Sequence, residues 1–251
     1  MEMFIICGIV GFIAQMIDGT LGMAYGISCT SFLLSMGIPP ALGIASVKSA
    51  EVFTTAASGI SHWIHGNVDK KLFIKLVLPG VLGGFIGAYA LSSLSNILIE
   101  TLRPLVAFYL LIMGGVIIAK AFAKKNVSTE IVRNPVPLAL WGGLLDAMGG
   151  GGWGPIVTSS LLASNKEPRM AIGSVNLAEF FVTLAQTITF LAFFGFQNKT
   201  IVLGLIAGGI IAAPFAAKLC KKIPTKTLMA VVGSLVIILS LRTILLALKL
   251  K

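Results

Sequence analysis

Charged side chains are scarce in this sequence: only 11% of the residues are Asp, Glu, Lys or Arg, while 57% are hydrophobic. Because soluble globular domains carry about 25% charged residues, this chain has too little polar surface to cover itself in water. Apolar stretches near or above the ~20 residues that span a bilayer recur from end to end. The composition excludes an ordinary soluble domain and predicts an all-α polytopic membrane protein.

Cysteine is also rare, and its spacing excludes a zinc-binding CxxC pattern and a disulfide framework. Cys7, Cys29 and Cys220 lie apart, each within or beside an apolar segment, which favours free thiols in the apolar phase. The chain contains no nucleophile elbow, Walker loop or HExxH pattern. We therefore expect neither an enzyme nor a bound cofactor.

Acidic residues are outnumbered: 9 Asp and Glu face 19 Lys and Arg, for a net charge of +10. The basic residues are thinly spread over short loops, which is typical of a membrane topology signal and not of a nucleic-acid-binding patch. The N-terminal stretch MEMFIICGIVGFIAQMIDG lacks the basic region of a cleavable signal peptide. We expect it to form the first membrane segment.

What the chain does have is a series of eight apolar segments separated by short polar loops. The longest polar stretch, 120–135, lies near the middle and predicts a basic linker between an N-terminal membrane repeat, 1–119, and a C-terminal membrane repeat, 136–251. The eight segments run over residues 3–36, 41–61, 72–92, 99–119, 136–163, 170–195, 200–217 and 226–248.

The two halves repeat each other at an offset of 128 residues. Residues 18–55 align with residues 146–183 without a gap, and 15 of the 38 positions are identical. Chance matches in an apolar chain would be Leu and Ala, whereas these include two acidic residues in register, Asp18 with Asp146 and Glu51 with Glu179. The alignment indicates an internal duplication.

The first and fifth segments are too long for one simple span. A helix over residues 3–36 would be ~51 Å long, against a hydrocarbon core of ~30 Å. Each of these segments is interrupted near its middle by an aspartate followed by glycines, DGTLGMAYG in the first half and DAMGGGGWGP in the second. We expect each to form two helical pieces joined at a break, either as a re-entrant hairpin or as two tilted spans.

Loop charges give the expected orientation of the halves. Basic residues alternate between loops within each half, and the pattern is reversed between the halves, as shown by Lys70, Lys71 and Lys75 against the single Lys199 in the equivalent loop. The positive-inside rule then predicts two inverted repeats, each with a bent element and three transmembrane helices. A parallel repeat of four simple spans in each half is the competing arrangement.

Four of the nine acidic residues lie inside apolar segments, and they form two repeat-related pairs: Asp18 with Asp146, and Glu51 with Glu179. An ionisable group within a membrane helix indicates a functional site by default. The alternative is a structural ion pair or hydrogen bond that holds the repeats together. We interpret these four residues as candidates for coupling to a proton or another ion.

Polar residues at equivalent positions accompany the two glutamates. Lys48 lies three residues before Glu51 on the same helical face, and its repeat partner Asn176 lies three before Glu179. Lys48 is a candidate ligand of a substrate anion or simply the partner of Glu51. Ser46 and Ser174 extend the same polar stretches, although small hydroxyl residues are also common helix-packing groups.

The glycines beside the aspartates predict a binding site. Irregular backbone at membrane depth is tolerated only where protein or a watery cavity surrounds it, and broken helices in two inverted halves indicate the site of a transporter. Bare N–H groups at the start of a helix suit a small anion, although glycines also serve close helix packing. The aspartates would repel an anion if ionised, so we expect them to be protonated, to bind a cation or to cap the next helix. The backbone candidates are Gly22, Gly149, Gly150, Gly151 and Gly152.

The stretch HWIH places His62 and His65 at a spacing of three residues. Two histidines at this spacing are a possible metal pair, but an interfacial position at a helix end beside Trp63 explains them more simply. We expect no metal site.

These features resemble a known family. The stretches IAQMIDGTLGMAYG, GIASVKSAEVFTTAASGISHW, GGLLDAMGGGGWGP and AIGSVNLAEFFVT are similar to the sulfite exporter TauE/SafE family, also called the 4-toluene sulfonate uptake permeases. The resemblance covers essentially the whole chain. It implies a secondary transporter of the plasma membrane, with substrates among sulfite, sulfonates and other small anions. The first-half glycine cluster is sparser than the second, which argues against equal anion binding by both halves.

Together these inferences predict a transporter that moves a small anion by alternating access, with sulfite or an organosulfonate as substrate and possible proton coupling. The alternative is a cation or proton transporter, or a channel, that uses the intramembrane carboxylates as ion ligands. Expected partners are the anionic solute, protons or another coupling ion, and membrane lipids, without nucleic acid.

Overall fold

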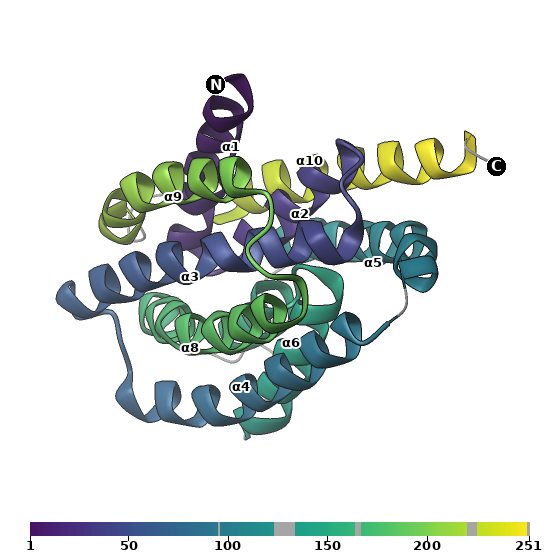
Figure 1. Cartoon of the computed structure of the whole chain (residues 1–251). Coiled ribbons are helices and arrows are strands. Elements are labelled where there is room, and N and C mark those ends of the chain that lie inside the picture. Colours follow the sequence, from purple (N-terminus) through teal and green to yellow (C-terminus); the bar gives the residue numbers. More distant parts are fainter. Residues whose placement is uncertain (95, 123–133, 164–166, 220–224, 250–251) are drawn as a thin grey trace.

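The computed structural model describes residues 1–94, 96–122, 134–163, 167–219 and 225–249 (Figure 1). Every regular element in these ranges is a helix, which confirms the all-α prediction. The helices are α1 Glu2–Leu21, α2 Tyr25–Ser35, α3 Pro40–Ile64, α4 Lys70–Ser92, α5 Asn96–Phe122, α6 Pro135–Gly149, the short π-helix η1 Gly154–Thr158, α7 Ser159–Ala163, α8 Pro168–Phe194, α9 Lys199–Leu219 and α10 Thr225–Lys249.

Within the described ranges, six helices are long and apolar enough to cross a membrane. They are α1, α4, α8 and α9, together with the parts Pro104–Phe122 of α5 and Met229–Leu246 of α10. Helix α3 has 25 residues, which is a sufficient length, but its polar side chains lower its mean hydropathy. Length and composition therefore identify a multi-pass membrane protein, and the most polar of the long helices is the one that carries Lys48 and Glu51.

The predicted breaks in the first and fifth apolar segments are confirmed. Helix α1 ends at Leu21, and Gly22 follows in the left-handed conformation with φ 67°. Helix α6 ends at Gly149, and Gly150 follows with φ 71°. Each glycine donates its N–H to the carbonyl oxygen of the aspartate four residues earlier, at 2.5 Å in the first half and 2.9 Å in the second. Glycine is needed here because this backbone conformation is costly for residues with a Cβ.

Several helix boundaries follow the 128-residue repeat. Pro40 and Pro168 both stand at the first helical position, of α3 and α8, where the missing N–H of proline costs nothing. Helices α4 and α9 begin at Lys70 and Lys199, and α5 and α10 at Asn96 and Thr225, within a residue of the repeat offset. The duplication seen in the sequence therefore extends to the order of the helices, although α1 has 20 residues and α6 has 15.

The helices pack in an order that reads the same from either end after the repeats are exchanged. Helix α1 packs on α9, α9 on α3, α3 on α8, α8 on α4 and α4 on α6. Exchange of the repeats swaps α1 with α6, α9 with α4 and α3 with α8, which reverses this order. Figure 1 shows α3 and α8 in the middle, with α1 and α9 on one side and α4 and α6 on the other. The two central helices carry both glutamates.

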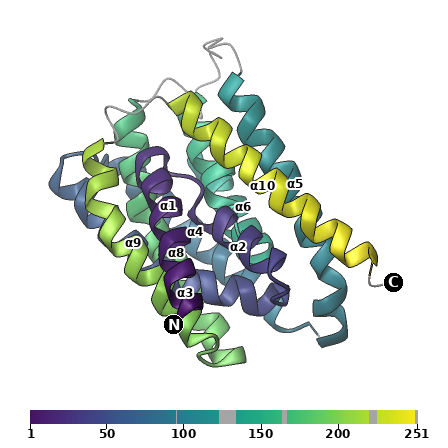
Figure 2. The same cartoon turned by 90° about the horizontal axis from the view of Figure 1, so that it is seen from above.

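Helices α5 and α10, which are also repeat counterparts, pack against each other along one edge of the molecule (Figure 2). Helix α5 continues to Phe122 and α6 begins at Pro135, so the ends of the predicted linker 120–135 are helical. Residues 123–133 of that linker lie outside the described residues.

Candidate functional site

The four acidic residues predicted within apolar segments are all buried, and each lies on a different helix. Asp18 on α1, Glu51 on α3 and Asp146 on α6 are 1%, 1% and 2% exposed, and Glu179 on α8 is 4% exposed. Lys48 on α3 is fully buried, and it is the only lysine or arginine with a buried side chain among the residues that the structure describes. These buried side chains therefore include one ammonium group and four carboxyl groups.

Lys48 joins the two halves through its ammonium group. Its Nζ lies 2.5 Å from Glu51 Oε2 on the same helix and 2.6 Å from Asp146 Oδ2 on the other repeat. The sequence pattern left open whether Lys48 is an anion ligand or the partner of Glu51. In this structure Lys48 is the partner of Glu51, and it also binds a second carboxylate that sequence spacing did not predict.

The Asp146 carboxyl group is held by four donors from three places. Its Oδ1 accepts from the N–H of Gly152 at 2.9 Å and of Trp153 at 3.3 Å, and its Oδ2 accepts from Gln186 Nε2 at 3.0 Å as well as from Lys48. Asp146 thus caps the backbone that resumes after the break, as one of the sequence alternatives proposed. Two backbone N–H groups, an amide and an ammonium are also the donors that recognise anions in proteins.

Asp18 performs the same capping in the first half with fewer partners. Its Oδ1 accepts from Tyr25 N–H at 3.3 Å, and Tyr25 is the repeat counterpart of Trp153. Its Oδ2 has no hydrogen-bond partner within the described residues, and neither does Oε2 of Glu179. The two halves of the site therefore share one plan but differ in how their carboxyl groups are neutralised.

The difference arises at one pair of equivalent positions, Lys48 and Asn176. Asn176 is also fully buried, but its amide is used by local groups: Oδ1 accepts from Ser58 Oγ at 2.8 Å, and Nδ2 donates to Ile172 O at 3.1 Å. Because Asn176 stands at the position of Lys48, the second repeat has no ammonium group three residues before its glutamate, Glu179.

The two breaks are joined by a reciprocal pair of hydrogen bonds. Thr30 Oγ1 on α2 donates to Gly150 O at 2.7 Å, and its counterpart Thr158 Oγ1 on η1 donates to Gly22 O at 2.5 Å. Each threonine thus satisfies the carbonyl of the left-handed glycine in the opposite half. The repeat-related hydroxyls of Thr55 and Thr183 lie 3.4 Å apart, so equivalent residues of the two halves also meet here.

The glycines of the second break are tightly enclosed by protein. A Cβ on Gly151 would lie 2.6 Å from the backbone nitrogen and Cα of Ile27, and a Cβ on Gly149 would lie 2.2 Å from the ring of Tyr109. Tyr109 on α5 also donates its hydroxyl hydrogen to Gly151 O at 3.0 Å. The four glycines therefore allow α2 and α5 to approach the break closely, in line with the packing explanation considered from the sequence.

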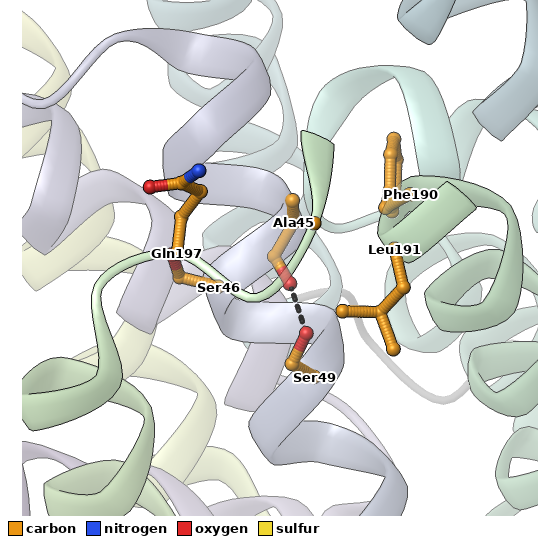
Figure 3. Close-up of a pocket in the computed structure, with 7 residues that line it drawn as sticks. Ala45, Ser46, Ser49, Phe190, Leu191 and Gln197 are labelled. Atoms are coloured by element: carbon orange, nitrogen blue, oxygen red, sulfur yellow. Dashed lines mark hydrogen bonds between the residues drawn. The ribbon is translucent and has the colours of Figure 1, made fainter. Parts of the chain in front are cut away.

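Ser46 and Ser174 lie away from the acidic cluster. Ser46 Oγ accepts from Asn198 Nδ2 at 3.1 Å, and Ser174 Oγ accepts from Asp69 N–H at 2.8 Å, so each serine holds the loop that precedes α9 or α4. Ser46 lies two residues from Lys48 and faces the other side of α3. It lines a small pocket where α3 meets α8, shown in Figure 3 with its other lining residues Ala45, Ser49, Phe190, Leu191, Gly195 and Gln197.

The two histidines of HWIH have separate partners. His62 is buried, with Nε2 2.9 Å from Gly19 O and Nδ1 3.3 Å from Asn67 Nδ2. His65 follows the end of α3, is exposed, and its Nδ1 lies 2.7 Å from Ser61 O of its own helix. Among the described residues, no three or more His, Cys, Asp or Glu side chains are arranged to hold a metal ion.

Several residues of the site were missed by reasoning from the sequence. Thr30 and Thr158 are identical residues in the 128-residue register, so the alignment contained a signal for them. Gln186 and Tyr109 have no such signal, since their repeat counterparts are Ser58 and Ile237 and only the three-dimensional contacts identify them.

Comparisons with known proteins agree with this architecture. The family model described as "Sulfite exporter TauE/SafE" matches residues 7–243. The probable membrane transporter protein YtnM of Bacillus subtilis (strain 168) is 41% identical over 254 residues, covering 97% of this chain and 83% of the relative. The probable membrane transporter protein YdhB of the same organism is 27% identical over 228 residues, covering 88% and 89%. No solved structure matches the chain significantly.

The family match spans most of the chain, and it agrees with the buried polar centre and with the apolar helices long enough to cross a bilayer. The chain is therefore a multi-pass membrane transporter of the plasma membrane. The chain belongs to the sulfite exporter TauE/SafE family.

Proposed function

We propose that this protein is a secondary transporter that moves a small anion, sulfite or an organosulfonate, by alternating access with proton coupling. The observation that carries the proposal is the set of donors around Asp146. The carboxylate lies where two backbone N–H groups, Gln186 Nε2 and Lys48 Nζ converge at 2.6 to 3.3 Å. A sulfite or sulfonate group presents the same kind of charged oxygen acceptors to such donors.

In this proposal the Asp146 carboxylate stands in for the substrate anion. An anion cannot share these donors with an ionised carboxylate, because two like charges in a buried site repel each other strongly. A proton on Asp146 removes its charge and weakens its bonds to Lys48 and to the backbone of Gly152. One protonation step therefore frees one hydrogen-bonding position of the Lys48 ammonium group, which stays paired with Glu51, and the backbone N–H groups of Gly152 and Trp153. Proton binding is thereby coupled to anion binding.

The other predicted contacts have different roles in the proposed site, which depend on how close they lie to the donors around Asp146. The backbone of Gly150, Gly151 and Gly152 shapes the approach to these donors, and Gly149 admits Tyr109 beside them. Gly22 and Asn176 belong to the equivalent region of the first break, where the Cβ position of Gly22 lies 3.4 Å from Asn176 Nδ2. Ser46 and Ser174 would act on the loops before α9 and α4, as proposed contacts along the path and not at the central cluster.

Alternating access is the proposed motion, and two inverted repeats, 1–119 and 136–251, are the proposed architecture. The palindromic helix order and the reciprocal bonds of Thr30 and Thr158 support a two-fold relation between the halves. The reversed loop charges support an axis in the plane of the membrane. Rocking of one half against the other about the central site is the mechanism that such repeats permit.

A second candidate function is a cation or proton transporter, or a channel, with Asp18, Glu51, Asp146 and Glu179 as ion ligands. The excess of carboxyl groups over ammonium groups in the cluster favours it. The engagement of Asp146 by four donors favours the anion proposal instead, since a cation ligand needs its lone pairs free.

The test is a transport assay with the purified chain reconstituted in lipid vesicles. We expect uptake of sulfite or an organosulfonate from a panel that also contains thiosulfate and carboxylates, faster when the outside is acidic. We expect Lys48→Gln to reduce this uptake at least tenfold, while Lys71→Gln, at an exposed position on α4, leaves it unchanged. Flux that follows a metal or Na⁺ gradient without dependence on any anion would favour the second candidate.

A further inference from the structure

The repeat symmetry defines two groups of three side chains that occupy equivalent positions. The first contains Lys48 and Glu51 of α3 with Asp146 of α6, and the second contains Asn176 and Glu179 of α8 with Asp18 of α1. Each group therefore takes a glutamate from a central helix and an aspartate from the break of the opposite repeat. The groups differ in charge, because only the first contains a cation.

In the first group, the lysine binds one oxygen of each carboxyl group. Glu51 Oε2 and Asp146 Oδ2 lie 2.5 and 2.6 Å from the same ammonium nitrogen. Two carboxylates and one ammonium group carry a net charge of −1. The backbone N–H groups that Asp146 accepts from lower the electrostatic cost of burying this charge.

In the second group the equivalent oxygens are left without partners. Asp18 Oδ2 and Glu179 Oε2 are buried and accept no hydrogen bond within the described residues. Gln15, one helical turn before Asp18 and fully buried, has neither its amide oxygen nor its amide nitrogen paired. Helices α1 and α8, which carry Asp18 and Glu179, are in contact with each other. This half of the site thus contains acceptors in excess and lacks one positive charge.

We propose that Asp18 and Glu179 together hold one proton, which takes the place that the ammonium group of Lys48 has in the repeat-related group, and that this pair is a second proton-binding site of the transporter, separate from Asp146. A proton gives one carboxyl group a donor and reduces the net charge of the group to −1, as in the first. Two carboxylic oxygens and an amide suffice for a proton, whereas within the described residues no larger ligand set for a metal ion occurs.

The pair lies among other ionisable side chains that a titration would also report. Those that face it from the surrounding elements are Tyr25 of α2, Lys48 and Glu51 of α3 and Asp146 of α6, and His62 of α3 contacts the turn of α1 that contains Asp18. A site-specific readout is therefore required.

Infrared spectroscopy of the purified protein at neutral pH provides this readout, because the C=O stretch of a protonated carboxyl group is separate from the bands of carboxylates. We expect wild-type protein to show one protonated-carboxyl band that is lost in Asp18→Asn and in Glu179→Gln. The repeat-matched control Glu51→Gln should retain the band. Asn176→Lys should also lose it, because the new ammonium group supplies the missing charge while both carboxyl groups remain.

A band that persists in both Asp18→Asn and Glu179→Gln, or that disappears only in Glu51→Gln, would overturn the inference. Helical circular dichroism and gel filtration identify any variant that fails to fold, and Asn176→Lys provides a test that removes no carboxyl group. The inference rests on the proposed proton coupling, but the band is measured without any transported solute. Its absence would therefore refute this site and leave the anion-binding proposal to be judged by the vesicle assay.

Discussion

Lys48→Met is expected to lower the melting temperature of the detergent-solubilised protein by roughly 6–20 °C. The substitution leaves Glu51 and Asp146 buried without the ammonium group that lies 2.5 and 2.6 Å from their oxygens. Breaking a buried ion pair by removing one partner costs about 3–5 kcal/mol, and each kcal/mol shifts the melting temperature by about 2–4 °C for a chain of this size. The comparison requires wild type and variant in the same detergent and at the same protein concentration.

The double variant Lys48→Met with Glu51→Gln is the matched control for this loss. It removes one of the two carboxylates that the lysine neutralised, so we expect it to recover part of the melting temperature. Acidification should narrow the difference between Lys48→Met and wild type, because the stranded carboxylates can then take up protons. Equal melting temperatures for Lys48→Met and wild type at neutral pH would show that the lysine does not neutralise a buried cluster.

Gly151→Ala is the second substitution with a large expected effect. Its Cβ would lie 2.6 Å from two backbone atoms of Ile27, which cannot yield as a flexible side chain does, so α2 has to move away from the break. Overpacking of this kind costs on the order of 3 kcal/mol, which corresponds to roughly 6–12 °C in melting temperature. The larger Gly151→Leu is expected to abolish transport.

Gly115→Ala on α5 is the control for Gly151→Ala. A Cβ at Gly115 meets no heavy atom within 4 Å, and alanine is favoured over glycine within a helix by about 0.5–1 kcal/mol. We therefore expect Gly115→Ala to melt at or slightly above the temperature of wild type. Equal melting temperatures for Gly151→Ala and wild type would contradict the close packing of α2 on the second break.

Much of the fold is predictable from the sequence because a membrane chain must satisfy its backbone hydrogen bonds within helices. Hydropathy therefore places the helices, and proline and glycine place their ends. The 128-residue repeat adds information of another kind, since each assignment in one half tests the other. The breaks after Asp18 and Asp146 are located by both signals, and both end in a left-handed glycine.

The partners of each side chain in the site were harder to predict. The sequence shows that Asp146 and Lys48 are both in apolar segments, but not that a distance of 2.6 Å joins them across the repeats. It shows four glycines, which suit either an exposed anion site or close packing, and only the positions of Ile27 and Tyr109 distinguish these. Contacts between distant segments depend on packing angles that local patterns do not encode.

In the proposed mechanism, a proton on Asp146 releases the donors that bind the substrate anion. Equilibrium binding of the best sulfonate from the transport panel, measured at several pH values, tests it most directly, since a sulfonate stays ionised throughout. We expect wild type to bind the sulfonate more tightly as the pH falls, Asp146→Asn to bind without this pH dependence, and Lys48→Gln not to bind. An equal pH dependence in wild type and Asp146→Asn would contradict this mechanism.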